Sequence, residues 1–262
     1  MVPYKCTMGI LAKRKGRLRQ LIPEFNTGQS RGIPGRTAGT KAHIINNIIA
    51  YSLQHDQPVA LVWFDLVKGY DLVTKAAVSD SVDCIGWGDD YKDLVLSSMT
   101  DFRAHVRTPY GPSLPFAYGN GVKQGDPASP DIYIDWMEML YRWADKKKLY
   151  YKMSLPEHIP RNPFFGRHVT VRAQGWIDDF GLITSPERAQ KGVDIVNHFA
   201  RTYNAQVSNK TEALAIGWQP DQPLQLNQEL ILWNDASTSL RILGYFFNPK
   251  RDLGHPEQNS HH

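Results

Sequence analysis

The chain is poor in cysteine and has no long apolar segment. Its two cysteines, Cys6 and Cys84, are too few for a disulfide scaffold or a four-cysteine zinc site. No run of roughly eighteen apolar residues and no signal-peptide pattern occurs, so we expect neither membrane insertion nor secretion. We expect the cysteines to be reduced and structural, which favours a cytoplasmic or nuclear location.

Acidic residues are almost absent from the first 41 positions, where Glu24 is the only one. The cations of this segment are Lys5, Lys13, Arg14, Lys15, Arg17, Arg19, Arg31, Arg36 and Lys41. Such a basic arm predicts either salt-sensitive contact with nucleic-acid phosphates or a merely solvated terminus. We expect residues 1 to about 20 to be irregular.

With 42% apolar residues, the 262-residue chain can bury a large core in one or two lobes. Periodicity predicts alternating helices and strands. The expected helices cover residues 40–53, 75–85, 89–99, 131–147 and 187–203, and the expected strands cover 59–64, 102–108, 116–118 and 212–216. Three prolines in residues 151–168 predict an insertion loop there.

Two adjacent carboxylates, Asp178 and Asp179, lie between two apolar segments. Residues 174–177 and 180–184 are typical of the arms of a hairpin, which places the acidic pair in its tight turn. Neighbouring like charges need compensation, and hard oxygen ligands suit Mg²⁺ or Mn²⁺. The alternative is a solvated turn, because aspartate is also a favoured turn residue.

A third carboxylate, Asp65, follows the continuous apolar run of residues 59–64, which is typical of a buried strand. If this strand lies beside the hairpin, three carboxylates converge. They would then suffice to hold two metal ions about 3.5–4 Å apart for phosphoryl transfer. The alternative for Asp65 alone is a helix cap or an ordinary strand end.

Residues 119–130 form a loop rich in glycine and proline before the predicted helix. Its glycines allow close backbone approach to a ligand, and a glycine-rich loop that opens into a helix is a general phosphate or ligand cradle. Taken alone, this loop is a weak indication of function.

The order of these segments resembles the palm motifs of reverse transcriptases. The matching segments are Phe64-Asp65 with Tyr70-Asp71, Gly121 to Pro130, Ile177-Asp178-Asp179, Asn209 to Glu212, and Leu243-Gly244-Tyr245. The glycine loop is most similar to that of the non-LTR (LINE-type) retrotransposon branch. Residues 21–24 and 29–40 are similar to the fingers segment of that family. The resemblance covers roughly residues 20–250 and implies an α+β polymerase palm, an antiparallel sheet flanked by helices, with partial fingers.

The resemblance also implies roles for single residues. Asp65, Asp178, Asp179 and the Leu66 carbonyl would hold Mg²⁺ or Mn²⁺. Tyr70 would lie beneath the incoming sugar and favour deoxynucleotides, its alternative being core packing. The remaining assignments are Gln124 and Gly125 along the nascent base pair, Lys123 toward phosphate, Lys210 near the triphosphate as a proton donor, Arg31 or Arg36 gripping the triphosphate, and Leu243, Gly244 and Tyr245 as the primer grip.

The chain departs from the family pattern at several positions. Trp176 and Ile177 stand where the family usually has Tyr and Ala, and Gly69 stands where it generally has Ala. Residues 204–209 are one residue shorter than usual, which leaves the placement of Lys210 open. We expect a basic arm and partial fingers over 1–58, a palm over 59–250 with a helical insertion at about 75–118, and a polar tail over 251–262. No thumb, endonuclease or RNase H domain is expected.

The function implied by the resemblance is that of an RNA-directed DNA polymerase. Its partners would be an RNA template, a DNA primer, dNTPs and other domains of a larger retroelement polyprotein. One alternative is a non-catalytic, nucleic-acid-binding remnant of a retroelement. The other is an RNA-dependent RNA polymerase that shares the palm, which an aromatic ring at Tyr70 argues against.

Overall fold

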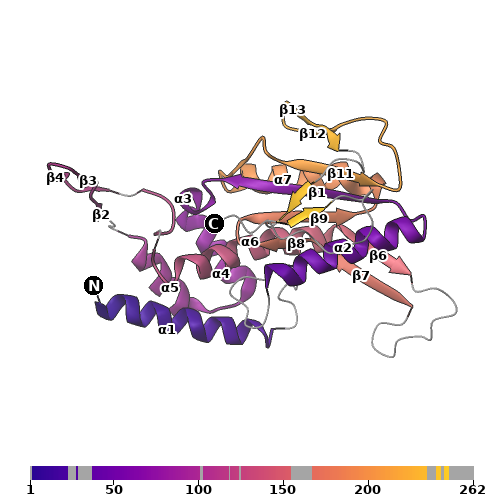
Figure 1. Cartoon of the computed structure of the whole chain (residues 1–262). Helices are drawn as coiled ribbons and strands as arrows, with labels where there is room; N and C mark the ends of the chain where they lie inside the picture. The colour runs from indigo at the N-terminus through magenta and orange to yellow at the C-terminus, as the bar shows by residue number, and fades with distance from the viewer. Residues whose placement is uncertain are drawn as a thin grey trace.

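The computed structural model describes residues 2–22, 28, 37–100, 103–117, 119–123, 125–154, 167–234, 240–242 and 245–247. They form an α+β fold, as predicted (Figure 1). The helices are α1 (Val2–Arg19), α2 (Ala38–Gln54), α3 (Gly69–Leu72), α4 (Lys75–Ile85), α5 (Asp89–Ser98), α6 (Ser129–Lys146), the 3-10 turn η1 (Pro186–Arg188) and α7 (Ala189–Thr202).

The central sheet has the strand order β14-β11-β1-β9-β8, and β10 pairs with the end of β1. Its strands are β1 (Val59–Val67), β8 (Gln174–Trp176), β9 (Asp179–Thr184), β10 (Gln206–Val207), β11 (Glu212–Ile216) and β14 (Trp233–Asn234). Strand β1 is antiparallel to both β9 and β11. The remaining strands form two-stranded ribbons: β2 (Arg103–Ala104) with β5 (Phe116–Ala117), β3 (Arg107–Thr108) with β4 (Gly111–Pro112), β6 (Tyr150–Ser154) with β7 (His168–Arg172), β12 (Leu224–Leu226) with β13 (Glu229–Ile231), and β15 (Leu240–Ile242) with β16 (Tyr245–Phe247).

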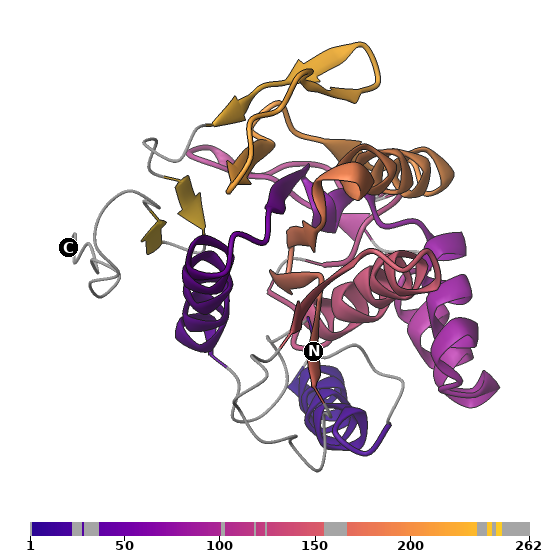
Figure 2. The ribbon, with the colours of Figure 1, turned by 90° about the vertical axis from the view of Figure 1, so that its right-hand side faces the viewer.

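Strand β1 is apolar at nearly every position because helices cover both faces of the sheet. Phe64 and its even-numbered neighbours pack against α4, α6 and α7. Trp63 and its odd-numbered neighbours pack against α2. Figure 2 shows α2 on one side of the sheet and α6 with α7 on the other. Because side chains alternate along a strand, Asp65 belongs to the α2 face.

Most predicted elements are confirmed within a residue or two, among them the helices over 75–85 and 187–203. The loop predicted over 151–168 is wrong at both ends, because β6 and β7 pair from Tyr150↔Arg172 to Ser154↔His168. Both cysteines are free and exposed, so the expectation that they are structural is not met. None of the described helices is long and apolar enough to span a membrane.

The irregular basic arm predicted for residues 1 to about 20 is also wrong, because these residues form α1. Lys15 and Arg19 are buried and form ion pairs with Asp131 and Asp135 of α6. The Lys15 Nζ to Asp131 Oδ2 distance is 2.9 Å, and the Arg19 guanidinium lies 2.5 Å from Asp135 Oδ1. These cations therefore neutralise buried carboxylates rather than phosphates.

Lys41 is likewise withdrawn from solvent. Its ammonium donates to Gln174 Oε1 at 2.6 Å, which ties α2 to β8. On α1, the exposed cations are Lys5, Lys13, Arg14 and Arg17. Of the nine basic residues in the first 41, only these four are described as exposed, since Arg31 and Arg36 lie outside the described residues. Among the described residues, Lys15, Arg19 and Lys41 are therefore withdrawn from any contact with nucleic acid.

Candidate active site

Asp65 and Asp179 face one another across two neighbouring strands. They are register partners in the antiparallel β1–β9 pair, and side chains of directly opposed residues lie on the same face. The Ser208 N–H donates to the Asp65 carbonyl at 2.7 Å, so the backbone of Asp65 bonds toward β10 rather than β9. Asp65 and Asp179 therefore form a non-hydrogen-bonded pair, in which Cα atoms approach to about 4.5 Å.

The same alternation places the Leu66 carbonyl. Because backbone groups of successive residues point to opposite edges of a strand, the Leu66 carbonyl is directed toward the β8–β9 hairpin. The β1–β9 register ends at Asp65 and Asp179, and Asp178 follows in the turn beyond it. The oxygen predicted as an extra metal ligand therefore points to the side where the acidic turn lies.

The predicted hairpin is confirmed, but its two-residue turn consists of Ile177 and Asp178, because Trp176 pairs with Asp179. Asp179 therefore begins β9, and the prediction that both carboxylates lie in the turn is wrong for Asp179. Ile177 occupies the first turn position with φ 59°, a left-handed conformation that a β-branched residue rarely adopts. Such strain persists only where the surroundings impose it, and Ile177 is buried in the main core. The strained turn holds Asp178, which is exposed, at the tip of the hairpin.

Like-charge repulsion is built into this corner of the sheet. Burial raises the pKa of the Asp179 carboxyl to about 6, with further contributions from Asp178 and, more weakly, Asp65. A hydrogen bond from Trp63 Nε1 to Asp179 Oδ1, at 3.4 Å, acts in the opposite direction. Gly181 makes this contact possible, because a Cβ at that position would overlap the Trp63 ring.

The donor set suits a hard divalent cation. Carboxylates and a backbone carbonyl are the ligands that Mg²⁺ and Mn²⁺ prefer, and a cation would relieve the repulsion at Asp179. In the described part of the chain, no three His, Cys, Asp or Glu side chains already enclose a metal-sized position. The residues thus fit a metal ion in chemistry, and their side chains are not preformed into a cage.

Asp179→Asn is expected to raise the unfolding temperature of metal-free protein by roughly 2–4 °C near neutral pH. A carboxyl whose pKa rises on folding lowers stability as the pH increases from its ordinary value of 3.8 to about 6. The stability that Asp179→Asn gains over the parent should therefore be complete above about pH 6 and absent below about pH 4. Thermal unfolding in EDTA at both ends of this range measures it.

The matched control is Asp194→Asn, which alters an exposed carboxylate of α7 and should leave stability within about 0.5 kcal/mol. An Asp179→Asn protein that is less stable than the parent near neutral pH would show that Asp179 is a structural residue.

The glycine loop packs against the turn that carries Tyr70. The Val122 N–H donates to the Tyr70 carbonyl at 2.8 Å, and the Gly121 N–H donates to the Val73 carbonyl at 2.9 Å. A Cβ on Gly121, whose φ is +93°, would lie 2.8 Å from the Cα atom of Asp71. The close approach predicted for a ligand is thus made at Gly121 to the protein's own backbone.

Comparisons with known proteins agree with this architecture. The chain is 29% identical over 112 residues to a Pol polyprotein from the R2 retrotransposable element of Popillia japonica, and 23% identical over 118 residues to a 149 kDa protein of transposon TX1 from Xenopus laevis. These matches cover 42% and 45% of the chain. No family model matches.

Among solved structures, telomerase from Candida tropicalis with a fragment of telomeric RNA superposes with a TM-score of 0.62 over 99% of the chain, at 14% identity. Telomerase from Candida albicans gives 0.61 over 97%. The chain therefore has the fold of a polymerase palm with fingers, and part of it is similar to proteins of non-LTR retrotransposons. It spans 18% of the R2 polyprotein, 9% of the TX1 protein and 38% of each telomerase chain.

Lys210 lies exposed in the turn between β10 and β11. Its N–H donates to Ser208 Oγ at 3.1 Å, and the Ser208 N–H in turn donates to the Asp65 carbonyl. The shortened segment before Lys210 therefore still brings its backbone to the carboxyl end of β1. Its role at the triphosphate stays a prediction.

The other predicted residues have no recorded contact with the carboxylates or lie outside the described part of the chain. The Lys123 ammonium lies 5.2 Å from the centroid of the Tyr4 ring of α1. Gly125 has φ +81° and open space around it. Arg31, Arg36, Gln124, Leu243 and Gly244 lie outside the described residues, and Tyr245 begins β16. The assignments to triphosphate grip, base pair and primer grip remain predictions.

Three residues next to the site were missed by sequence reasoning. Trp63 and Gly181 are register partners that place the indole beside Asp179. Tyr133 of α6 stacks on Tyr70 with ring centroids 4.6 Å apart and planes inclined by 9°. A glycine in an otherwise apolar strand was the available signal for the first pair, because it marks close approach of another group. Tyr133 left no such signal.

Proposed function

We propose that this chain is the catalytic core of an RNA-directed DNA polymerase. The observation that carries the proposal is the pairing of Asp65 with Asp179 on one face of the sheet, beside the strained turn that presents Asp178. A fold shared with telomerase, and partial similarity to retrotransposon polyproteins, support the same class of reaction.

In the proposed reaction, the primer 3′-hydroxyl oxygen attacks the α-phosphorus of a dNTP. The bond from that phosphorus to the bridging oxygen of the β-phosphate breaks, and pyrophosphate leaves. Mg²⁺ or Mn²⁺, when bound, would supply activation of the hydroxyl and neutralisation of the phosphate charge. Asp65, Asp178, Asp179 and the Leu66 carbonyl are the groups proposed to hold these ions.

The rest of the site aligns the reactants. Tyr70 would lie under the sugar, where a ring excludes a ribose 2′-hydroxyl. Lys210 would neutralise or protonate the departing pyrophosphate. Holding the 3′-hydroxyl and the α-phosphate in line supplies much of the barrier reduction, because the protein itself does little covalent chemistry. This alignment requires the backbone bonds that link β1, the glycine loop and the turn before β11.

Primer extension on poly(rA)/oligo(dT) with Mg²⁺ or Mn²⁺ tests the proposal. Metal-dependent incorporation of dTTP supports it. Binding of the primer-template with no incorporation under either metal would support the competing function, a non-catalytic nucleic-acid-binding remnant. Preferential incorporation of UTP would instead point to an RNA-dependent RNA polymerase.

A basic ribbon formed by β2 to β5 is the surface proposed to contact the nucleic acid. Residues 103–117 contain no acidic residue. Arg103 and Arg107 are exposed, and Tyr110 at the tip is 100% exposed. The ribbon projects from the end of the molecule that carries α3 (Figure 1) and leads into the loop bonded to Tyr70. Arginine can pair with phosphate, and an exposed ring can stack on a base.

Joint replacement of Arg103 and Arg107 by alanine is expected to weaken primer-template binding and to lower the salt slope by about one per lost phosphate contact. Titration of a labelled primer-template at several salt concentrations measures both. The matched control is Lys191→Ala, since Lys191 is exposed on α7, which covers the face opposite the carboxylates. An unchanged slope in the double variant would remove the ribbon from the binding surface.

A further inference from the structure

The glycine at position 69 is explained by a tyrosine far away in the sequence. A Cβ on Gly69 would lie 2.9 Å from Cζ of Tyr133 and closer still to its hydroxyl oxygen. Real Cβ atoms do not approach neighbours so closely, so an alanine, which the family generally has here, would force Tyr133 to move. The Tyr133 ring therefore fills the space that a side chain at position 69 would need.

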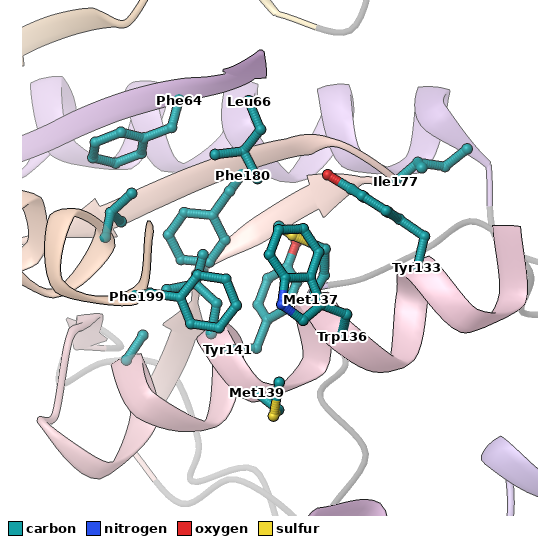
Figure 3. Packing of buried hydrophobic residues seen from close by; sticks show 14 of the residues in the cluster. Phe64, Leu66, Tyr133, Trp136, Met137, Met139, Tyr141, Ile177, Phe180 and Phe199 are labelled. Carbon is teal, nitrogen blue, oxygen red and sulfur yellow. The ribbon is translucent and has the colours of Figure 1, made fainter. Parts of the chain in front are cut away.

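Tyr133 has no room to yield. It is fully buried on α6, where the Trp136 ring packs edge-on against it with centroids 5.2 Å apart. Figure 3 shows its side chain rising from α6 toward the strands that carry Leu66 and Phe180. Among the described residues, its hydroxyl has no hydrogen-bond partner, a cost that a phenylalanine would avoid. The residue is held here by shape rather than by a polar contact.

The Tyr133 ring also packs against Tyr70. Its ring lies nearly parallel to that of Tyr133, in the offset stack that aromatic pairs prefer. The backbone of Tyr70 is fixed independently by the Val122 N–H. With its backbone held by the glycine loop and its ring resting on Tyr133, the half-buried Tyr70 side chain has one defined height above α6.

We propose that Tyr133 is a positioning residue for sugar selection, and that Gly69 provides the space it needs. The ring of Tyr133 sets the height of the Tyr70 ring and thereby the clearance for the 2′-position of the incoming nucleotide. Discrimination between dNTP and rNTP in this chain then depends on a buried residue that touches no substrate. This inference rests on the proposed polymerase function.

The test is the ratio of kcat/KM for dTTP to that for UTP on poly(rA)/oligo(dT). Tyr70→Ala defines the full loss of discrimination. Tyr133→Leu removes the supporting ring and should lower the ratio by about tenfold or more, and Gly69→Ala, which displaces the ring, should do likewise. Tyr133→Phe keeps the stack and should retain the parent ratio. Combining Tyr133→Phe with Gly69→Ala should recover part of the ratio, because the closest clash is with the hydroxyl.

Tyr141→Leu is the matched control, since Tyr141 is equally buried on the same helix and packs on Phe180 instead of Tyr70. It should lose stability without a change in the ratio. If Tyr133→Leu keeps the parent ratio while Tyr70→Ala loses it, the positioning role is refuted. An unchanged ratio in Tyr70→Ala would refute sugar selection by Tyr70 itself and the inference with it.

Thermal unfolding separates this inference from the proposed function. Gly69→Ala should be less destabilising in the Tyr133→Phe background than in the parent, whether or not the protein polymerises. Equal destabilisation in both backgrounds would overturn the shared space on which the inference stands. If this coupling is present but the parent shows no metal-dependent incorporation, it is the proposed function that fails, and sugar selection fails with it.

Discussion

Asp178→Asn is expected to lower metal-dependent nucleotide incorporation by about a thousandfold or more. The metal ions that Asp178 would help to hold stabilise the charge of the transition state by several kcal/mol. Asp178 is exposed at the tip of the β8–β9 hairpin and supports no packing. The folded state should therefore be unaffected, and the loss should appear in kcat rather than in stability. Primer extension with Mg²⁺ and with Mn²⁺ measures it.

Asp65→Asn should have a comparable effect, because Asp65 is the register partner of Asp179. Asp194→Asn serves as the control, because Asp194 is exposed like Asp178 and lies on α7, away from the site. Incorporation by Asp178→Asn within about tenfold of the parent would exclude Asp178 as a metal ligand, since one tenfold step corresponds to only about 1.4 kcal/mol. The proposed mechanism would then need another acceptor.

Arg19→Met is expected to destabilise the protein by about 3–5 kcal/mol, which is the usual cost of removing one partner from a buried ion pair. Arg19 and Lys15 together neutralise Asp131 and Asp135, all four in the interface between α1 and α6. Burial alone would raise the pKa of Asp135, but Arg19 and Lys15 outweigh it and hold that pKa below its ordinary value of 3.8. Methionine replaces the unbranched part of the arginine side chain without the guanidinium group, and leaves two carboxylates facing one lysine.

Thermal unfolding should show a decrease on the order of 10 °C for Arg19→Met. Arg17→Met, at an exposed position of the same helix, should stay within about 0.5 kcal/mol of the parent. Because folding depresses the pKa of Asp135, the stabilisation is complete above its ordinary value and is lost as the pH falls below about 3.8. Equal behaviour of the two arginine variants would show that α1 is a dispensable arm.

The basic residues of α1 show what a local sequence pattern can and cannot predict. Lys15 and Arg19 have the same local composition around them as Arg14 and Arg17, so a charge count treats all four alike. Their separation into buried and exposed depends on Asp131 and Asp135, more than a hundred residues away. Only the packing of α1 on α6 brings the opposite charges together.

The sequence by itself determined most elements around the carboxylates, although not α1 or the β6–β7 ribbon. Apolar periodicity was sufficient for the hairpin around Asp178 and Asp179 and for the strand before Asp65, because each pattern reflects burial of its own segment. The order of motifs was sufficient for the palm fold. Each segment is recognised from residues close together in the chain, and only the order of the motifs extends over most of it.

The tertiary structure alone decided which residues meet. The pairing of Asp65 with Asp179 follows from the strand register. A slip of one residue would place the two carboxylates on opposite faces of the sheet. The contact of Gly69 with Tyr133, and the stack of Tyr133 on Tyr70, join helices more than sixty residues apart. Such contacts depend on how side chains from distant elements pack together, and the periodicity of a single segment does not predict that packing.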